Sequence, residues 1–107
     1  MLFVLDSLPT SIQPVSNGIP GGFKLHQNFP NPFNPETKIV LEVPVRSAVT
    51  LSIYSSEGRL VRKVINNTVN AGVYEVTVNG KYLSSGVYFY TLNTGQWKDT
   101  KRMVLLK

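Results

Sequence analysis

The stretch Val49-Thr50-Leu51-Ser52-Ile53-Tyr54 alternates apolar and polar side chains. Successive side chains of a β-strand point to opposite faces, so this alternation predicts a strand that packs Val49, Leu51 and Ile53 inward. The run Tyr74–Val78 alternates in the same way and predicts a second strand of this kind. Both inner faces are therefore expected to form part of the core.

Further apolar runs lie on both sides, separated by turn signals at a spacing of about 8–12 residues that is typical of a sandwich or barrel. Val87–Leu92 is apolar on both faces, as expected of a central strand. Glycine follows Glu57, Asn79 and Thr94 where the chain must reverse, and it tolerates the positive φ that such turns need. The sequence has no long run with the 3.6-residue period of a helix. We therefore predict an all-β fold, an immunoglobulin-like β-sandwich of about seven antiparallel strands. The predicted strands include Lys38–Val43, Val49–Tyr54, Leu60–Ile65, Val73–Val78, Val87–Leu92 and Trp97–Leu106.

All seven prolines lie in the first 44 residues of the chain. Proline fixes φ and removes a backbone donor, so residues 6–22 are expected to form an extended linker or an edge segment and not a central strand. Residues 2–5 could add one short edge strand. These expectations divide the chain into a tail of residues 1–24 and a sandwich domain of residues 25–107.

Length, composition and charge restrict the class of protein. A chain of 107 residues has the length of one domain, and 42% hydrophobic residues suffice for a packed core. There is no cysteine, which excludes disulfides and thiolate metal sites. The net charge is +5, but the basic residues are scattered from Lys24 to Lys107 without a groove-reading motif, so no nucleic acid is expected as a partner. No run approaches the roughly 20 apolar residues that cross a bilayer, so no direct membrane insertion is expected.

The residue types that catalysis and metal binding need are sparse. His26 is the only histidine, and it lies beside a proline-rich loop, where a polar loop role is more common than catalysis. The six acidic residues are dispersed without an Asp-rich calcium loop, and the glycines form no phosphate-binding loop. We therefore expect no enzyme activity, no cofactor and no metal site.

Aromatic side chains offer another function, because exposed Trp and Tyr on a β-sandwich can stack on sugar rings. Tyr88 and Tyr90 share one strand face, however, and there packing or cross-strand pairing is the expected role. The aromatic candidates for sugar binding are Trp97, Tyr54, Tyr82, Tyr88 and Tyr90.

Two stretches carry a family resemblance. Leu25-His26-Gln27-Asn28-Phe29-Pro30-Asn31-Pro32-Phe33-Asn34-Pro35-Glu36-Thr37-Lys38-Ile39 resembles the Gln-Asn-Tyr-Pro-Asn-Pro-Phe-Asn-Pro-x-Thr-x-Ile opening of the type A C-terminal sorting domains of the bacterial type IX secretion system. Leu83–Tyr90 and Lys101–Lys107 are similar to that family's Leu-x-Ser-Gly-Val-Tyr-Phe-Tyr strand and Lys-Met-Val-Leu-Leu-Lys ending. The resemblance covers about residues 25–107. It departs from the family at Val78–Tyr82, where many relatives carry Trp-Asp-Gly-Arg-Asp.

The opening motif also has a physical interpretation of its own. Its prolines, three of them within six positions, are expected to hold the backbone extended and stiff. Phe29 and Phe33 could anchor this backbone onto the sandwich. Asn28, Asn31 and Asn34 could hydrogen-bond backbone groups that the prolines leave unpaired.

The resemblance implies a non-catalytic C-terminal sorting signal that directs a cargo protein through the type IX secretion system, via the periplasm, to the cell surface or medium of a Gram-negative bacterium. It implies a translocon and a sortase-like peptidase as partners, and a passenger domain in cis upstream of residues 1–24. The last strand is the expected recognition element, because an edge strand offers free hydrogen-bonding groups. The residues that the translocon is expected to recognise are Pro30, Asn31, Pro32, Phe33, Asn34, Pro35, Gly86, Tyr88, Lys101, Met103, Val104, Leu105, Leu106 and Lys107.

The alternative function is a structural or carbohydrate-binding immunoglobulin-like accessory module of a secreted protein. Such a module would be akin to the sandwich of flagellar hook-capping proteins, to which the sorting domains are related. An exposed aromatic strip would favour this alternative, whereas fold alone does not separate the two functions.

Overall fold

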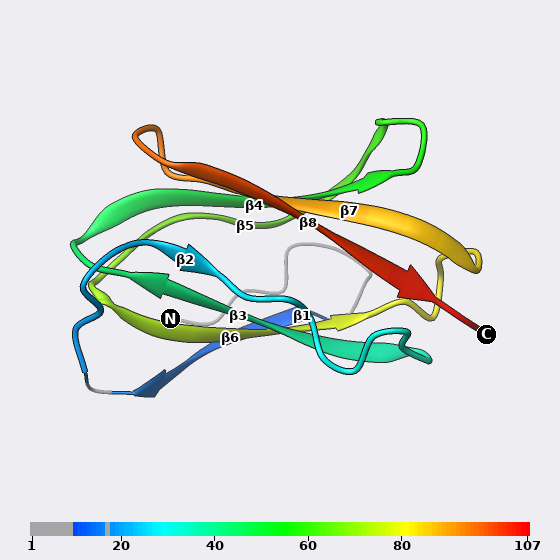
Figure 1. Cartoon of the computed structure of the whole chain (residues 1–107), viewed down its shortest axis with the longest axis horizontal. Helices are drawn as coiled ribbons and strands as arrows, with labels where there is room; N and C mark the ends of the chain where they lie inside the picture. The colour runs from blue at the N-terminus through cyan, green and yellow to red at the C-terminus, as the bar shows by residue number, and fades with distance from the viewer. Residues whose placement is uncertain (1–9, 17) are drawn as a thin grey trace.

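The computed structural model describes residues 10–16 and 18–107, and over these residues the chain forms eight strands and no helix. Two four-stranded sheets stack on each other, in the orders β1-β6-β3-β2 and β5-β4-β7-β8 (Figure 1). The predicted all-β sandwich is confirmed, with one strand more than expected. The strands are β1 (Thr10–Ser16), β2 (Lys24–Leu25), β3 (Glu36–Val43), β4 (Ser47–Ser55), β5 (Leu60–Val69), β6 (Gly72–Asn79), β7 (Gly86–Asn93) and β8 (Lys98–Leu105).

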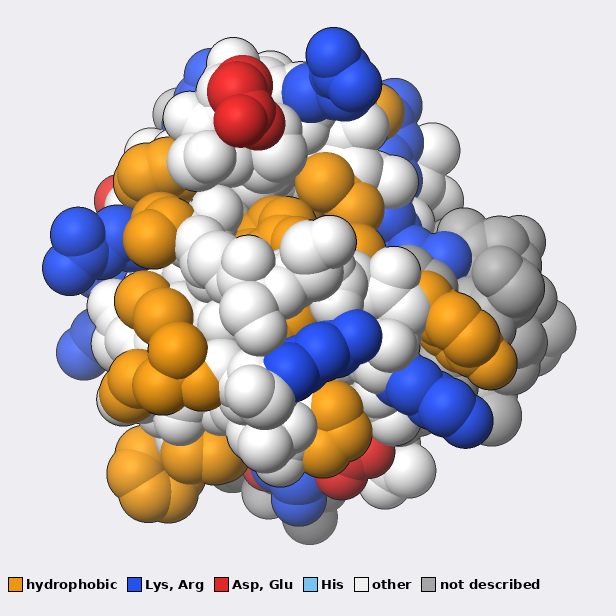
Figure 2. Space-filling model, turned by 90° about the vertical axis from the view of Figure 1, so that its right-hand side faces the viewer, with side chains coloured by type: hydrophobic (Ala, Val, Ile, Leu, Met, Phe, Trp, Pro, Cys, Tyr) orange, Lys and Arg blue, Asp and Glu red, His pale blue; other side chains and the backbone are white. Residues whose placement is uncertain are grey.

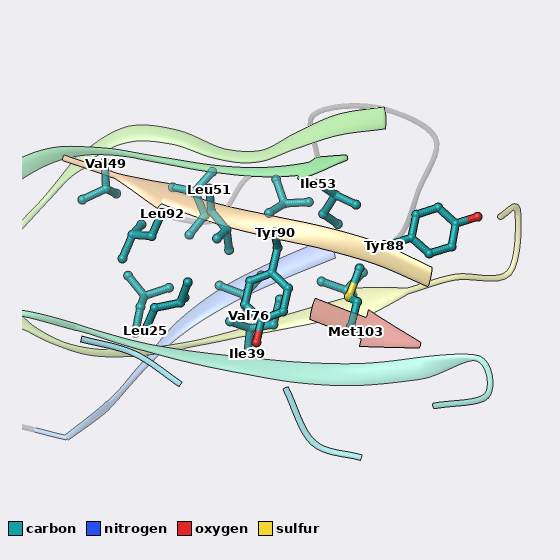
Figure 3. Packing of buried hydrophobic residues seen from close by; sticks show 14 of the residues in the cluster. Leu25, Ile39, Val49, Leu51, Ile53, Val76, Tyr88, Tyr90, Leu92 and Met103 are labelled. Atoms are coloured by element: carbon teal, nitrogen blue, oxygen red, sulfur yellow. The ribbon is translucent and has the colours of Figure 1, made fainter. Parts of the chain in front are cut away.

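The core lies between the two sheets and follows the predicted alternation. Val49, Leu51 and Ile53 of β4 are buried, as predicted from the first stretch. β7 lies between β4 and β8, which confirms its central position. Figure 3 shows how side chains from the two sheets meet in one layer, and the ring of Tyr90 extends from β7 toward the opposite sheet. The described residues include no helix long and apolar enough to span a membrane.

Both edge strands of the β1-β6-β3-β2 sheet come from the proline-rich part of the chain. β1 pairs antiparallel with β6, and its register shifts between Pro14 and Ser16. A proline is tolerated here because only one side of an edge strand must supply ladder hydrogen bonds. The short strand expected at residues 2–5 lies outside the described residues.

The turns confirm two of the three predicted glycine positions and correct the third. Gly58 and Gly95 have φ values of 86° and 87°, the left-handed region that glycine tolerates. Gly80 is not among the positive-φ residues, so the prediction was wrong for this turn. A Cβ at Gly80 would lie 2.9 Å from Leu105 Cδ2 and 3.2 Å from Phe33 Cε2. Glycine is therefore required at this position by close packing and not by φ.

Candidate functional site

The residues predicted for translocon recognition come from three segments that meet at one end of the sandwich. These segments are the loop of residues 30–35, the start of β7 and the end of β8, beside the C-terminus in Figure 1. In the β7–β8 ladder, Gly86 pairs with Leu105 and Tyr88 pairs with Met103. Phe33 forms a parallel bridge with Leu105. Segments separated by more than 50 residues in sequence thus form one structural unit.

The proline-rich loop is folded back on itself and is not the extended segment that the sequence predicted. Two backbone hydrogen bonds close it, from Phe29 N to Lys38 O at 2.9 Å and from Lys38 N to Phe29 O at 3.0 Å. The reason is the sheet order, because β2 and β3 are antiparallel neighbours and the chain between them must reverse. The peptide bonds that precede Pro30, Pro32 and Pro35 are cis.

Asn28 holds this loop together from the inside. Its Nδ2 donates to Pro30 O at 3.1 Å and to Thr37 Oγ1 at 2.9 Å, and Thr37 Oγ1 donates to Pro30 O at 2.8 Å. Asn28 and Thr37 are both buried, where a polar side chain costs free energy unless it is hydrogen-bonded. The expectation that Asn28 binds backbone groups beside the prolines is confirmed.

The two phenylalanines of the motif differ sharply in burial. Phe33 is buried in the core, which confirms its predicted anchoring role, whereas Phe29 is 79% exposed and anchors nothing. Phe33 occupies the space beneath Gly80, whose backbone N donates to Pro35 O at 2.7 Å. The loop, the β6–β7 turn and β8 therefore pack together around one aromatic ring.

The outer edge of β8 is covered by residues 27–33, which we call the opening segment. Gln27 Nε2 donates to Arg102 O at 2.6 Å, and Val104 N donates to Asn31 Oδ1 at 2.9 Å. Phe33 completes the contact, because its N donates to Val104 O at 2.9 Å and its O accepts from Leu106 N at 3.0 Å. The expectation that the edge of the last strand offers free hydrogen-bonding groups is thus wrong between Arg102 and Leu106.

Burial divides the predicted recognition residues into two groups. The side chains of Phe33, Tyr88, Met103 and Leu105 are buried and form part of the core. Lys101, Val104 and Gly86 are half-buried, and the ammonium of Lys101 lies 3.8 Å from an Asp99 carboxylate oxygen. We call the exposed group the terminal face; its members are Pro30, Asn31, Pro32, Asn34, Pro35, Leu106 and Lys107.

The last residue of the terminal face is held in place. Lys107 N donates to Ser85 Oγ at 3.0 Å, and its Nζ donates to Lys81 O at 2.7 Å. Leu106 remains 54% exposed beside it. Figure 2 looks onto this end of the molecule and shows hydrophobic side chains interspersed with Lys and Arg side chains. The face therefore combines apolar and cationic groups, which suits recognition by a protein surface more than a chemical reaction.

Tyr90 lies in the core, and its hydroxyl holds the backbone at the start of the opening segment. Its hydroxyl donates to His26 O at 2.7 Å and accepts from Asn28 N at 2.8 Å. Burial raises the pKa of the Tyr90 phenol, so it stays protonated and able to donate. This role of Tyr90 was not predicted from the sequence. The available signal was a tyrosine on the inner face of a central strand, since a buried hydroxyl requires a partner.

Of the remaining candidates for chemistry or sugar binding, four make structural contacts, whereas Tyr54 is half-buried and Tyr82 is 64% exposed beside Lys81. His26 Nε2 lies 2.6 Å from Glu42 Oε2. Tyr88 and Tyr90 are buried, and Trp97 stacks on Phe23 with a centroid distance of 5.8 Å. Tyr82 is thus the one exposed side chain among the five aromatic candidates and does not make an aromatic strip by itself, so nothing here favours the accessory-module alternative.

The fold and this end of the molecule define an immunoglobulin-like sandwich whose N-terminal loop is bound to its last strand. The sequence model of the secretion system C-terminal sorting domain matches residues 27–106, and the chain belongs to this family. No curated protein sequence matches this chain.

The chain is therefore a C-terminal sorting signal for type IX secretion. This function implies interaction with the type IX machinery, a passenger domain in cis and export to the cell surface or medium. The family is not catalytic. The matched residues include both the opening segment and the whole of β8, so the two segments that form the contact described above belong to the family's domain.

Proposed function

We propose that the translocon of the type IX system recognises the terminal face, with Leu106 and Lys107 as its principal contacts. The observation that carries this proposal is the exposure of these two side chains on a backbone that is held by hydrogen bonds to Phe33 and Ser85. A fixed backbone lowers the entropy lost on binding, because fewer groups must be ordered when the partner docks.

The buried members of the predicted set act indirectly in this proposal. Met103 and Leu105 are fully buried, so their side chains position the strand and do not meet the partner. Removal of residues 99–107 would delete these core residues together with Leu106 and Lys107. Loss of export after such a deletion would therefore not separate misfolding from lost recognition.

A sharper experiment substitutes exposed residues only. In a reporter carrying this domain, Leu106→Ser together with Lys107→Glu should reduce export at least tenfold while the far-UV circular dichroism and the melting temperature of the purified domain stay unchanged. Lys98→Glu is the matched control, since Lys98 is exposed at the opposite end of the same strand and carries the same change of charge. Normal export of the double variant, or equal loss with Lys98→Glu, would contradict the proposal.

The remaining parts of the proposal concern the route and the processing of the cargo. The passenger is joined through residues 1–24, and the assembled protein crosses the periplasm of a Gram-negative cell before it reaches the translocon. A sortase-like peptidase then acts on the cargo in trans, and this chain contributes no catalytic group. The engagement of His26 by Glu42 and the burial of Tyr88 and Tyr90 support a structural role for these residues.

The domain division has a practical consequence for experiments on this proposal. β1 pairs with β6 along most of its length although it precedes the matched residues. A fusion that begins at residue 25 would lack β1, so a fusion for export assays should begin no later than Thr10. We expect the shorter fusion to be less stable and to show lower export for that reason.

A further inference from the structure

Each sheet edge of this sandwich needs protection against pairing with another chain, because an edge strand presents a row of backbone donors and acceptors. β2 is only two residues long, and β1 contains Pro14 and an irregular register. β5 carries Arg62 and Lys63 and pairs irregularly with β4. Short length, proline, irregularity and charge are known means of preventing edge-to-edge association.

β8 is protected by two different means along its length. Residues 98–102 contain three cations, Lys98, Lys101 and Arg102, against one acid, Asp99, and this net positive charge opposes the addition of a like-charged strand. The run that follows, residues 103–106, includes the end of β8 and the next residue; it is Met-Val-Leu-Leu and carries no charge. An uncharged apolar run without proline on an edge is the sequence type most prone to strand addition.

The opening segment covers this uncharged run through hydrogen bonds to its backbone. In an antiparallel ladder, the backbone groups of alternate residues point to opposite sides of the strand. Val104 directs its N and O away from β7, and both are bound, by Asn31 Oδ1 and Phe33 N respectively. Arg102 O and Leu106 N, on the same side, are bound by Gln27 and Phe33. Residues 27–33 thus occupy the groups that an added strand would use.

We propose that residues 27–33 are an intramolecular edge cap, and that the edge they cover is a latent self-association surface for a second copy of this chain. Two β8 strands can pair antiparallel about Val104. That register places Met103 opposite Leu105 and Arg102 opposite Leu106. The like charges that face each other are those of Lys101 and the other copy's Lys107, and Lys107 lies beyond the end of β8 at Leu105. Over residues 102–106 the uncapped edge is therefore compatible with an identical partner in both hydrophobicity and charge. This inference concerns the state of the free domain and does not depend on which residues the translocon contacts.

Amide hydrogen exchange tests the cap directly. In Asn31→Ala, the Val104 amide should exchange about fivefold faster, the change expected for one lost hydrogen bond. The Met103 and Leu105 amides, which face β7, should be unaffected. Asn34→Ala is the matched control, because Asn34 is an exposed asparagine of the same loop for which the described residues show no hydrogen bond to β8. Equal acceleration of all these amides would show general destabilisation and overturn the assignment of a cap.

The oligomeric state tests the latent surface. The variant Gln27→Ala, Asn31→Ala, Phe33→Ala should change from monomer to dimer in light scattering at concentrations where the unaltered domain is a monomer. The milder double variant Gln27→Ala, Asn31→Ala keeps the core residue Phe33, and it should self-associate at least tenfold more tightly than the unaltered domain.

A rescue substitution separates strand addition from non-specific aggregation. Adding Leu106→Lys to the double variant places a charge opposite Arg102 in the proposed pair, so the monomer should be restored. Leu106 is half-exposed, so the substitution leaves the core intact. A folded double variant that stays monomeric while its Val104 amide exchanges faster would overturn the proposal, as would a dimer that persists with Leu106→Lys.

Discussion

The substitution Tyr90→Phe tests how the core positions the opening segment. The change removes one hydroxyl and leaves the ring, so packing against the core is retained. The hydroxyl accepts from Asn28 N and donates to His26 O at 2.8 and 2.7 Å. Asn28 is 2% exposed, so water cannot readily replace the lost acceptor. Leaving a buried backbone donor unpaired costs about 1–3 kcal/mol.

The assay is urea unfolding of the purified domain followed by tryptophan fluorescence of Trp97. In a thermal melt of the same variants, each kcal/mol of lost stability should lower the melting temperature by roughly 4–8 °C in a domain of this size. Tyr88→Phe is the matched control on the same strand, because its hydroxyl makes one hydrogen bond, to Ser84 O at 2.6 Å, near the surface. We expect it to cost about half as much or less. A loss below about 0.5 kcal/mol for Tyr90→Phe, or equal losses for both, would refute the reasoning.

Three further outcomes are expected. Because burial raises the pKa of Tyr90, the folded state keeps a proton that the unfolded chain releases above its ordinary pKa of about 10. This contribution to stability is complete below about pH 10 and is lost as the pH rises further. The urea midpoints at about pH 8 and about pH 10.5 should therefore differ less in Tyr90→Phe than in the unaltered domain. Gly80→Ala should cost about 1–3 kcal/mol, since its Cβ would lie 2.9 Å from a methyl carbon of Leu105, and a neutral result in thermal unfolding would show that the turn relaxes freely. Phe33→Ala should cost about 3–5 kcal/mol and Phe29→Ala less than about 0.5, and similar unfolding midpoints for the two variants would be inconsistent with the burial of only one ring.

The strands were predictable because each depends on a short-range pattern. The alternation of Val49, Leu51 and Ile53 indicates burial of one face. The Val87–Leu92 run, apolar on both faces, indicates a central strand, whose outer residues Val87 and Phe89 are half-buried. Such patterns are expected in any fold in which two layers of secondary structure pack against each other. The fold class therefore follows from local sequence to a large extent.

The organisation of the candidate site was less predictable because it depends on contacts distant in sequence. Gln27 and Arg102 are 75 positions apart, and Asn31 and Val104 are 73 apart. Nothing in the local sequence distinguishes Phe33, which enters the core, from Phe29, which does not. Gly80 shows the same limit, since a turn glycine that needs a positive φ and one that needs space look alike in sequence.

The edge strand β1 illustrates a different limit. Pro14 and the polar residues of β1 argue against a central strand, and the structure agrees in placing it at an edge. Its pairing depends on the free side of β6, which sequence patterns near residue 10 do not report. The residues upstream of the matched domain thus contribute to the sandwich both through the pairing of β1 and through side chains, since Leu25 is buried in the core and Ile12 and Phe23 pack against it.

The most direct test of the central claim is export of a fluorescent protein fused to residues 10–107 behind a Sec signal peptide. The fusion is expressed in type IX-competent cells and in an otherwise identical translocon mutant, and fluorescence is measured in the periplasm, at the cell surface and in the medium. The sorting function predicts surface or medium fluorescence in competent cells and periplasmic retention in the mutant. Periplasmic retention in both strains, with a folded domain, would contradict it.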